Sequence, residues 1–151
     1  AQIARDIAQL DIGMREQADK DEAIAERMDI LASIPGVGRL TAITMLVDMP
    51  ELGTLEAKQV AALAGLAPIT QQSGKWQGTA RIQGGRPWIR RALYMPALVA
   101  VRFNPDLKAK STQFIDAGKP PKLALTAIMR KLLVMANTLL RDHRMWSEVQ
   151  P

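Results

Sequence analysis

The chain lacks cysteine altogether and is poor in aromatic residues, with one tyrosine, two phenylalanines and three tryptophans among 151 residues. Without cysteine it forms neither a disulfide scaffold nor a thiolate zinc site, which fits a reducing compartment. No run approaches the roughly 18–20 apolar residues of a membrane span, and no signal peptide is visible. Eight methionines, with many alanines and leucines, favour packed helices over a β-sandwich. The length fits one domain.

Acidic residues are also missing from one long segment. None occurs between Glu56 and Asp106, whereas seven lysines and arginines do. Residues 1–60 carry a net charge of −5 and residues 61–151 a net charge of +10. Such a polarised chain directs its basic part at an acidic partner, and nucleic acid fits best because bound cations release the counterions of the phosphate backbone. A membrane surface fits less well, since no basic amphipathic helix carries an aromatic anchoring face. A solvated basic face is the simpler alternative.

The first 33 residues predict two helices, at about 2–18 and 22–33. Ile3, Ile7, Leu10 and Met14 have the 4-3-4 spacing of a coiled-coil seam. Asp19 and Glu22 have capping-box spacing at the start of the second helix. The abrupt start indicates either a fragment of a longer protein or a short two-helix hairpin that packs on its own domain, and the residues do not favour one over the other.

A PGVG turn follows, and then an apolar helix at about 40–49. Helix, glycine turn and helix resemble the helix-hairpin-helix motif, in which Gly36 and Gly38 would let the backbone approach a phosphate and Arg39 would add charge. The alternative is a tight turn between packed helices. Acidic neighbours Asp29 and Asp48 would weaken phosphate binding.

The segment 66–85 is a Gly-rich basic loop, for which we predict a short hairpin around 76–82. Helices are predicted at about 55–64, capped by Thr54, at 87–102, from 105 to Gly118, and at 122–141. The fold class is therefore mainly α. We expect a compact helical domain with a helix-hairpin-helix-like motif, the Gly-rich basic loop and an N-terminal coiled-coil-like helix.

Several ordered motifs carry a resemblance: IPGVGRLTA, LAGLAPITQQSG, RIQGGRPWIRRALYM, FNPDLK and GKPPKLALTAIMRKLL. Together they closely resemble the C-terminal domain of bacterial insertion-sequence transposases of the one-ten/eleven-eleven type, relatives of the Piv DNA invertases. The resemblance divides the chain into 1–30, the end of a helical linker, 31–146, the transposase domain, and 147–151, a tail. Gln83-Gly84-Gly85-Arg86 departs from the K-x-G-N that the family often has.

The resemblance implies a two-part enzyme. An N-terminal RuvC-like domain, absent here, would supply a DEDD set of carboxylates with Mg²⁺, and this domain would supply a serine nucleophile. The family serine lies in the QSG motif, and therefore at Ser73. DNA, a structured bridge RNA, the RuvC-like domain and, in the full-length protein, further copies are the expected partners, in the bacterial cytoplasm at the nucleoid. This chain would need no cofactor and would be inactive alone.

The chemistry of strand cleavage also fits Ser73 and the basic residues near it. A serine can attack a phosphodiester and hold the DNA covalently, and nearby cations would stabilise the crowded phosphate. Ser73 could also be a small polar residue in a turn, chosen for the backbone shape. Without the resemblance, the residues alone would favour this second interpretation. Beside the turn Gly36, Gly38 and Arg39, the predicted nucleic-acid contacts are Lys75, Arg81, Arg86, Arg90 and Arg91.

Other residues fit catalysis less well. His143 is expected on the surface, and Tyr94 lacks the Arg/His/Arg set of a tyrosine recombinase. Trp76 and Trp88 could stack on unpaired bases, although core packing is the preferred prediction. A non-catalytic helix-hairpin-helix module and an ordinary helical interaction domain are the alternative functions.

Overall fold

The computed structural model describes residues 2–69, 72–73, 76–77, 81–82 and 84–147, with only the backbone described at 18–19, 69, 72–73, 76–77 and 81. The helices are α1 (Gln2–Asp19), α2 (Glu22–Ala32), α3 (Arg39–Asp48), α4 (Ala57–Leu63), α5 (Pro87–Phe103), α6 (Pro105–Asp116) and α7 (Pro121–Arg141). The strands are β1 (Pro68–Ile69), β2 (Gln72–Ser73), β3 (Trp76–Gln77) and β4 (Arg81–Ile82). The prediction of a mainly α fold is confirmed.

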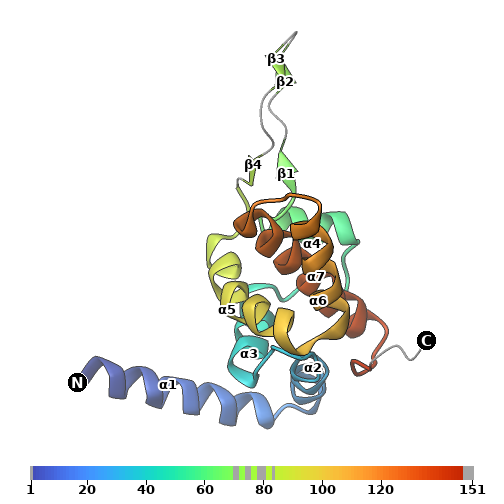
Figure 1. The fold of residues 1–151 in the computed structure, drawn as a ribbon. Helices are drawn as coiled ribbons and strands as arrows, with labels where there is room; N and C mark the ends of the chain where they lie inside the picture. Colours follow the sequence, from blue (N-terminus) through green and yellow to red (C-terminus); the bar gives the residue numbers. More distant parts are fainter. Residues whose placement is uncertain (1, 70–71, 74–75, 78–80, 83, 148–151) are drawn as a thin grey trace.

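Helix α7 is the core of the helical body, where it contacts α2, α4, α5 and α6 (Figure 1). Ile128, Leu132 and Ala136 are fully buried on the inward side of α7. By length and composition alone α7 could span a bilayer. Its packing accounts for the apolar composition, because each buried leucine or isoleucine side chain contributes roughly 1.5–3 kcal/mol to folding.

The connection between α3 and α4 is held onto α7 by one buried side chain. The Asn137 Oδ1 accepts a hydrogen bond from the Gly53 backbone N–H at 2.7 Å, and its Nδ2 donates to the Leu55 carbonyl oxygen, also at 2.7 Å. Asn137 is 1% exposed, so both groups of its amide are satisfied within the protein. This loop is thereby fixed to the core although it has no regular structure.

Helix α1 leaves the body as an arm and contacts only α2 and α3 among the described elements (Figure 1). Its predicted seam is uncovered, with Ile3, Ile7 and Leu10 between 54% and 75% exposed. The predicted cap of α2 was wrong. Asp21, not Asp19, is the N-cap, because its carboxylate accepts hydrogen bonds from the Ala23 and Ile24 backbone N–H groups.

Two further local predictions are corrected. Glu56 rather than Thr54 caps α4, in a capping box with Gln59, while the Thr54 hydroxyl donates to the Glu51 carbonyl oxygen. The hairpin is longer than the predicted 76–82, since β1 pairs with β4 and β2 with β3, all antiparallel. Proline at the start of α5 and Gly65 after α4 are as predicted.

Candidate nucleic-acid interface

The two glycines of the PGVG turn have different surroundings. Gly36 has a φ of +100°, and a Cβ there would lie 2.8 Å from both the Ala100 nitrogen and the Pro96 oxygen of α5. Packing of the turn against α5 therefore requires glycine at this position, as the tight-turn alternative proposes. Gly38 is the exposed N-cap of α3, and no atom lies within 4 Å of the position that a Cβ would take there. Only Gly38 leaves space for an approaching phosphate.

Arg39 begins α3 and lies next to an acidic side chain. Its Nη1 is 3.3 Å from the Asp29 Oδ1, and both side chains are about half exposed. An exposed pair of this kind is worth roughly 0–1 kcal/mol, so a phosphate could compete with the carboxylate for the guanidinium. The start of α3 thus has an accessible backbone at Gly38, and beside it the Arg39 cation, which is already paired with Asp29.

Ser73 lies in the hairpin that projects from the helical body, with β2 and β3 beyond β1 and β4 (Figure 1). Ser73 pairs in register with Trp76, and Arg81 in β4 pairs with Ile69 in β1. For Ser73, Trp76 and Arg81 only the backbone is described, and Lys75 lies outside the described residues. The hairpin therefore holds the predicted serine away from the core helices.

Arg86, at the end of the hairpin, contacts the protein through its side chain and its backbone. Its Nη1 donates to the Asp48 carbonyl oxygen at 2.7 Å, and its Nη2 is 2.6 Å from the Glu51 Oε1. The Arg86 backbone N–H also donates to the Leu63 carbonyl oxygen at 2.8 Å. The hydrogen bond from the Arg86 guanidinium lowers the pKa of the Glu51 carboxyl below its ordinary value. Arg86 thus fixes the end of the hairpin to the ends of α3 and α4.

Arg90 has a similar position one turn along α5. Its Nη1 donates to the Ala64 carbonyl oxygen at 3.1 Å and to the Gly84 carbonyl oxygen. A side chain at Gly65 would overlap both this guanidinium and the Gly84 carbonyl, and one at Gly85 would overlap the Gly65 backbone. Both glycines have φ of +66°. Ala64, Gly65, Gly84, Gly85 and Arg90 form what we term the hairpin base, where the two ends of the hairpin meet in backbone contact.

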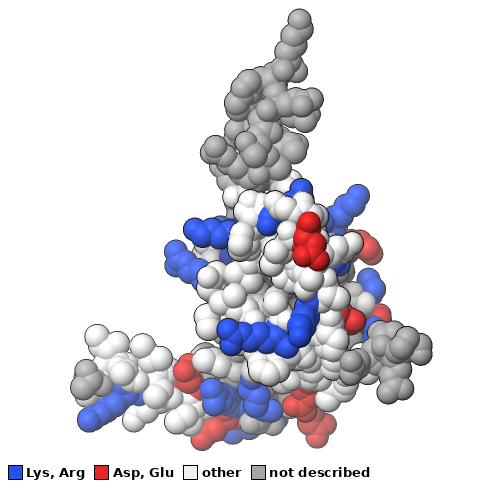
Figure 2. All heavy atoms as spheres, in the orientation of Figure 1, with Lys and Arg blue, Asp and Glu red and all other residues white. Residues whose placement is uncertain are grey.

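Arg91 differs from both. Its side chain is exposed on α5, and no hydrogen bond or salt bridge joins it to the described part of the chain. Figure 2 shows further lysines and arginines around the upper body, and acidic side chains both on the body and near α1 and α2. The exposed basic residues around the hairpin and on α5 and α7 include Lys58, Arg91, Arg102, Lys119 and Lys122.

The described residues contain no group of three or more His, Asp or Glu side chains that could hold a metal ion. His143 is exposed, as predicted, with its Nδ1 3.7 Å from a Glu26 oxygen. Trp88 is 54% exposed, so the preferred prediction of core packing was wrong for this residue.

Residues 28–112 match the model of the transposase family IS116/IS110/IS902. This match covers more than half of the chain and includes the PGVG turn, the hairpin and α5. The chain belongs to the IS116/IS110/IS902 transposase family.

Similar proteins include a gene-inverting protein and proteins of two insertion elements. The pilin gene-inverting protein of Moraxella bovis is 33% identical over 144 residues, which cover 91% of this chain and 44% of that protein. The uncharacterized 42 kDa protein of insertion element IS900 from Mycobacterium paratuberculosis is 30% identical over 159 residues, 97% of this chain and 38% of that protein. An uncharacterized 43.6 kDa protein of insertion element IS110 from Streptomyces coelicolor is 30% identical over 125 residues, which cover 81% of this chain and 31% of that protein.

The chain therefore spans less than half the length of these relatives. From the sequence, Arg86 and Arg90 were predicted to act like the other cations, and neither Glu51 nor Asn137 was identified. The Glu51 carboxylate and the Asp48 and Ala64 carbonyl oxygens that these arginines contact come from distant parts of the chain. No local pattern in the sequence marks them.

Proposed function

We propose that this chain is the serine-bearing part of a DNA transposase and recombinase, which binds the nucleic-acid backbone and cuts and rejoins DNA strands. The observation that carries the proposal is the family match over 28–112, which contains Ser73 and the hairpin on which it lies. Inversion of a pilin gene, named for one relative, is a rearrangement that needs both strand cleavage and rejoining.

In the proposed reaction the Ser73 Oγ attacks a DNA phosphorus atom. The new bond joins Oγ to phosphorus, the bond from phosphorus to one deoxyribose oxygen breaks, and the serine proton is transferred, through a base, to that leaving oxygen. Rejoining reverses these steps with the hydroxyl of another strand as nucleophile. The phosphodiester energy is kept in the protein–DNA bond, so no external energy source is needed.

Activation of the serine is assigned to groups beyond the described residues. Since the described carboxylates do not form a metal site, we assign Mg²⁺ and its DEDD ligands to a RuvC-like domain that acts with this chain. On this proposal the chain alone binds nucleic acid without completing recombination. A structured guide RNA is the proposed second nucleic-acid partner, and the nucleoid in the cytoplasm the proposed site of action.

Within this chain, Arg86 and Arg90 hold the hairpin in place by their protein contacts. The exposed cations around the hairpin and on α5 and α7, Arg91 among them, contact the phosphate backbone, helped by the 49-residue segment 57–105 that has no carboxylate. Gly38 and the first backbone N–H groups of α3 offer a second phosphate contact, because a helix N-terminus attracts anions.

Ser73→Ala tests the proposal, in a transposase that joins this sequence to the RuvC-like domain. We expect loss of strand exchange and of the covalent protein–DNA adduct, with duplex binding little changed, because only the nucleophile is removed. Thr79→Ala, the same kind of change in the same loop, is the control and should recombine normally. If Ser73→Ala still forms recombinants, Ser73 is not the nucleophile, and the non-catalytic helix-hairpin-helix module becomes the better description.

A further inference from the structure

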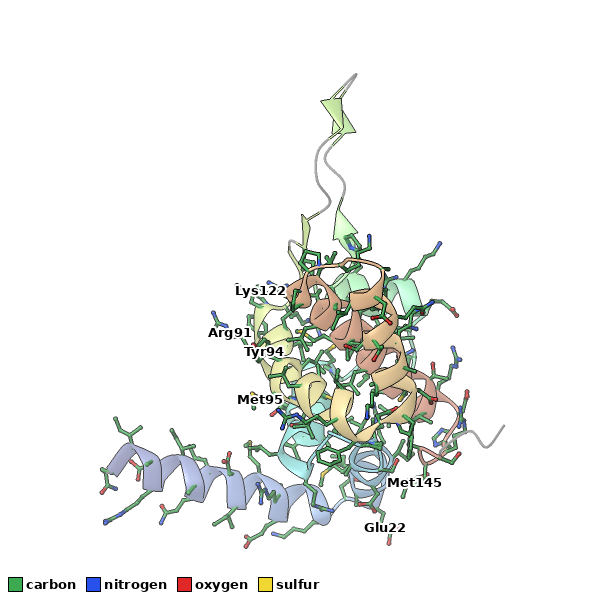
Figure 3. All side chains as sticks on the ribbon, in the orientation of Figure 1. Glu22, Arg91, Tyr94, Met95, Lys122 and Met145 are labelled. Atoms are coloured by element: carbon green, nitrogen blue, oxygen red, sulfur yellow. The ribbon has the colours of Figure 1, made fainter. Side chains whose placement is uncertain are left out.

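Helices α6 and α7 pack against each other, and a cleft follows their contact toward the hairpin. The cleft consists of two adjoining cavities, one of about 600 Å³ and one of about 210 Å³. Phe114 of α6 and Ala127 and Arg130 of α7 line both, and we term the two cavities together the α6–α7 cleft. The smaller cavity is also lined by residues of β1 and β4, where the hairpin starts and ends. Figure 3 shows Lys122, in the first turn of α7, near the end of the body from which the hairpin projects.

The walls of the α6–α7 cleft carry more positive than negative charge. The charged residues are Lys110, Lys119, Arg130 and Lys131, with Asp106 as the one carboxylate. The Lys110 Nζ lies 5.1 Å from the centroid of the Phe114 ring and donates to the Gln113 Oε1 at 2.6 Å, so this ammonium group is held over the ring. Four cations against one carboxylate favour an anionic ligand.

Arg130 differs from the other half-buried arginines among the described side chains. Those are Arg27, Arg86 and Arg90, and each donates to a backbone carbonyl oxygen of a distant residue. No hydrogen bond or salt bridge joins Arg130 to the described part of the chain, although its side chain is half-buried as well. Charged groups that leave bulk water are normally paired, so the Arg130 guanidinium, which lines both cavities, needs an acceptor from outside the protein.

The smaller cavity has an apolar interior beside this cation. Apart from Lys119, Thr126 and Arg130, all its lining residues are apolar, and they include Phe114 and Leu123. A phosphate would not fill such a cavity, whereas the flat face of a nucleic-acid base stacks on aromatic and apolar side chains. A duplex keeps its bases stacked inside, so only an unpaired base can enter. An apolar protein side chain would fill the cavity but would leave Arg130 without a partner.

We propose that the α6–α7 cleft binds one unpaired nucleotide of a nucleic-acid strand, with the base in the smaller cavity and a phosphate on Arg130 and Lys119. This inference rests on the proposed function for the presence of nucleic acid, and not on the chemistry of Ser73. A base in the smaller cavity contacts β1 and β4, so the unpaired nucleotide packs against both ends of the hairpin. DNA and RNA share the chemistry that this site recognises.

Fluorescence anisotropy titrations of the 151-residue chain test the proposal. The probes are a fully paired duplex and the same duplex with one unpaired adenine, each made once as DNA and once as RNA. The duplex with the unpaired adenine should bind at least about fivefold more tightly, because a base stacked on protein side chains adds affinity. A preference within the DNA pair, the RNA pair or both supports the proposal and identifies the strand that the cleft takes.

Variants of the cleft show whether the preference arises there. Arg130→Ala removes the unpartnered cation, and Ala127→Leu narrows both cavities with an apolar side chain. Each should abolish the preference and leave the affinity for the paired duplex little changed, with circular dichroism showing an intact fold. Lys108→Ala and Phe103→Ala, an exposed cation and a 69% exposed aromatic residue outside the cleft, are the controls and should keep the preference.

The outcomes separate this inference from the proposed function. Equal affinity for paired and unpaired probes overturns the inference alone, leaves backbone binding standing and makes a protein side chain the better occupant of the cleft. A preference that survives both Arg130→Ala and Ala127→Leu places the unpaired nucleotide elsewhere, which also overturns it. A chain that binds none of the probes at low salt overturns the inference together with the proposed nucleic-acid binding.

Discussion

Arg90 and Arg91 are adjacent in the chain but have different roles in the structure. Successive residues of a helix point about 100° apart, so Arg90 faces the hairpin base while Arg91 faces solvent. From the sequence both were predicted to bind phosphate. That prediction stays open for Arg91, and the contacts of Arg90 give it a structural role. The direction of each side chain depends on where α4 and the hairpin end meet α5, which the spacing of charges does not reveal.

At the residue scale, Arg90→Ala should lower the free energy of unfolding by roughly 1.5–3 kcal/mol, because the Ala64 and Gly84 carbonyl oxygens lose a charged donor. Arg91→Ala is the matched control and should change stability by no more than about 0.5 kcal/mol. Urea unfolding followed by circular dichroism measures both. Equal stability of the two variants would show that the contacts of Arg90 do not hold the hairpin base.

At the scale of elements, every helix was predicted to within a few residues. Apolar periodicity indicated the first helices and α7, because each buries a stripe of apolar side chains, and cap, proline and glycine signals placed α4, α5 and α6. Helix caps were harder to predict, since Asp19, Asp21 and Glu22 all lie near the start of α2 and each has a carboxylate that could cap it. Asp21 is the N-cap because its backbone is extended and its carboxylate reaches the first N–H groups of the helix. The hairpin was predicted too short because its outer pairs form only when β1 and β4 meet, and eleven residues of the chain separate these two strands.

The contact between Arg86 and Glu51, which joins α5 to the loop after α3, should make stability depend on pH. The Glu51 pKa is lowered in the folded protein, so the pair stabilises the fold above the ordinary carboxyl value of 4.5 and loses this effect as pH falls below it. Glu51→Gln should be less stable at neutral pH and should lose less stability on acidification. Urea unfolding at neutral and acidic pH measures this.

Glu16→Gln, on the exposed side of α1, is the control for that measurement. Its acid dependence should equal that of the wild-type chain. If Glu51→Gln also follows the wild-type curve, the carboxylate does not stabilise the loop through Arg86.

For the whole molecule, the charge is divided between two regions, with the acidic residues concentrated in the first 60 positions. We expect duplex DNA binding that weakens steeply with salt, because each phosphate contact lowers the slope of log K against log salt by about 0.9. Lys58→Ala with Lys122→Ala should make this slope shallower. Arg5→Ala with Arg15→Ala, on α1, should leave it unchanged, and a titration by fluorescence anisotropy distinguishes the two. If both pairs of substitutions made the slope equally shallow, the nucleic acid would not bind specifically at the surface that carries Lys58 and Lys122.

The hairpin base has a consequence for how this protein can vary. Because the chain leaves the body after Gly65 and returns at Gly84 in direct backbone contact, the distance between those two points is set by the body and not by the residues between them. Insertions or deletions within 67–82 would therefore add little cost to closing the loop, since that cost grows only slowly with length. The reach of Ser73 can change over generations while the helical body keeps its sequence.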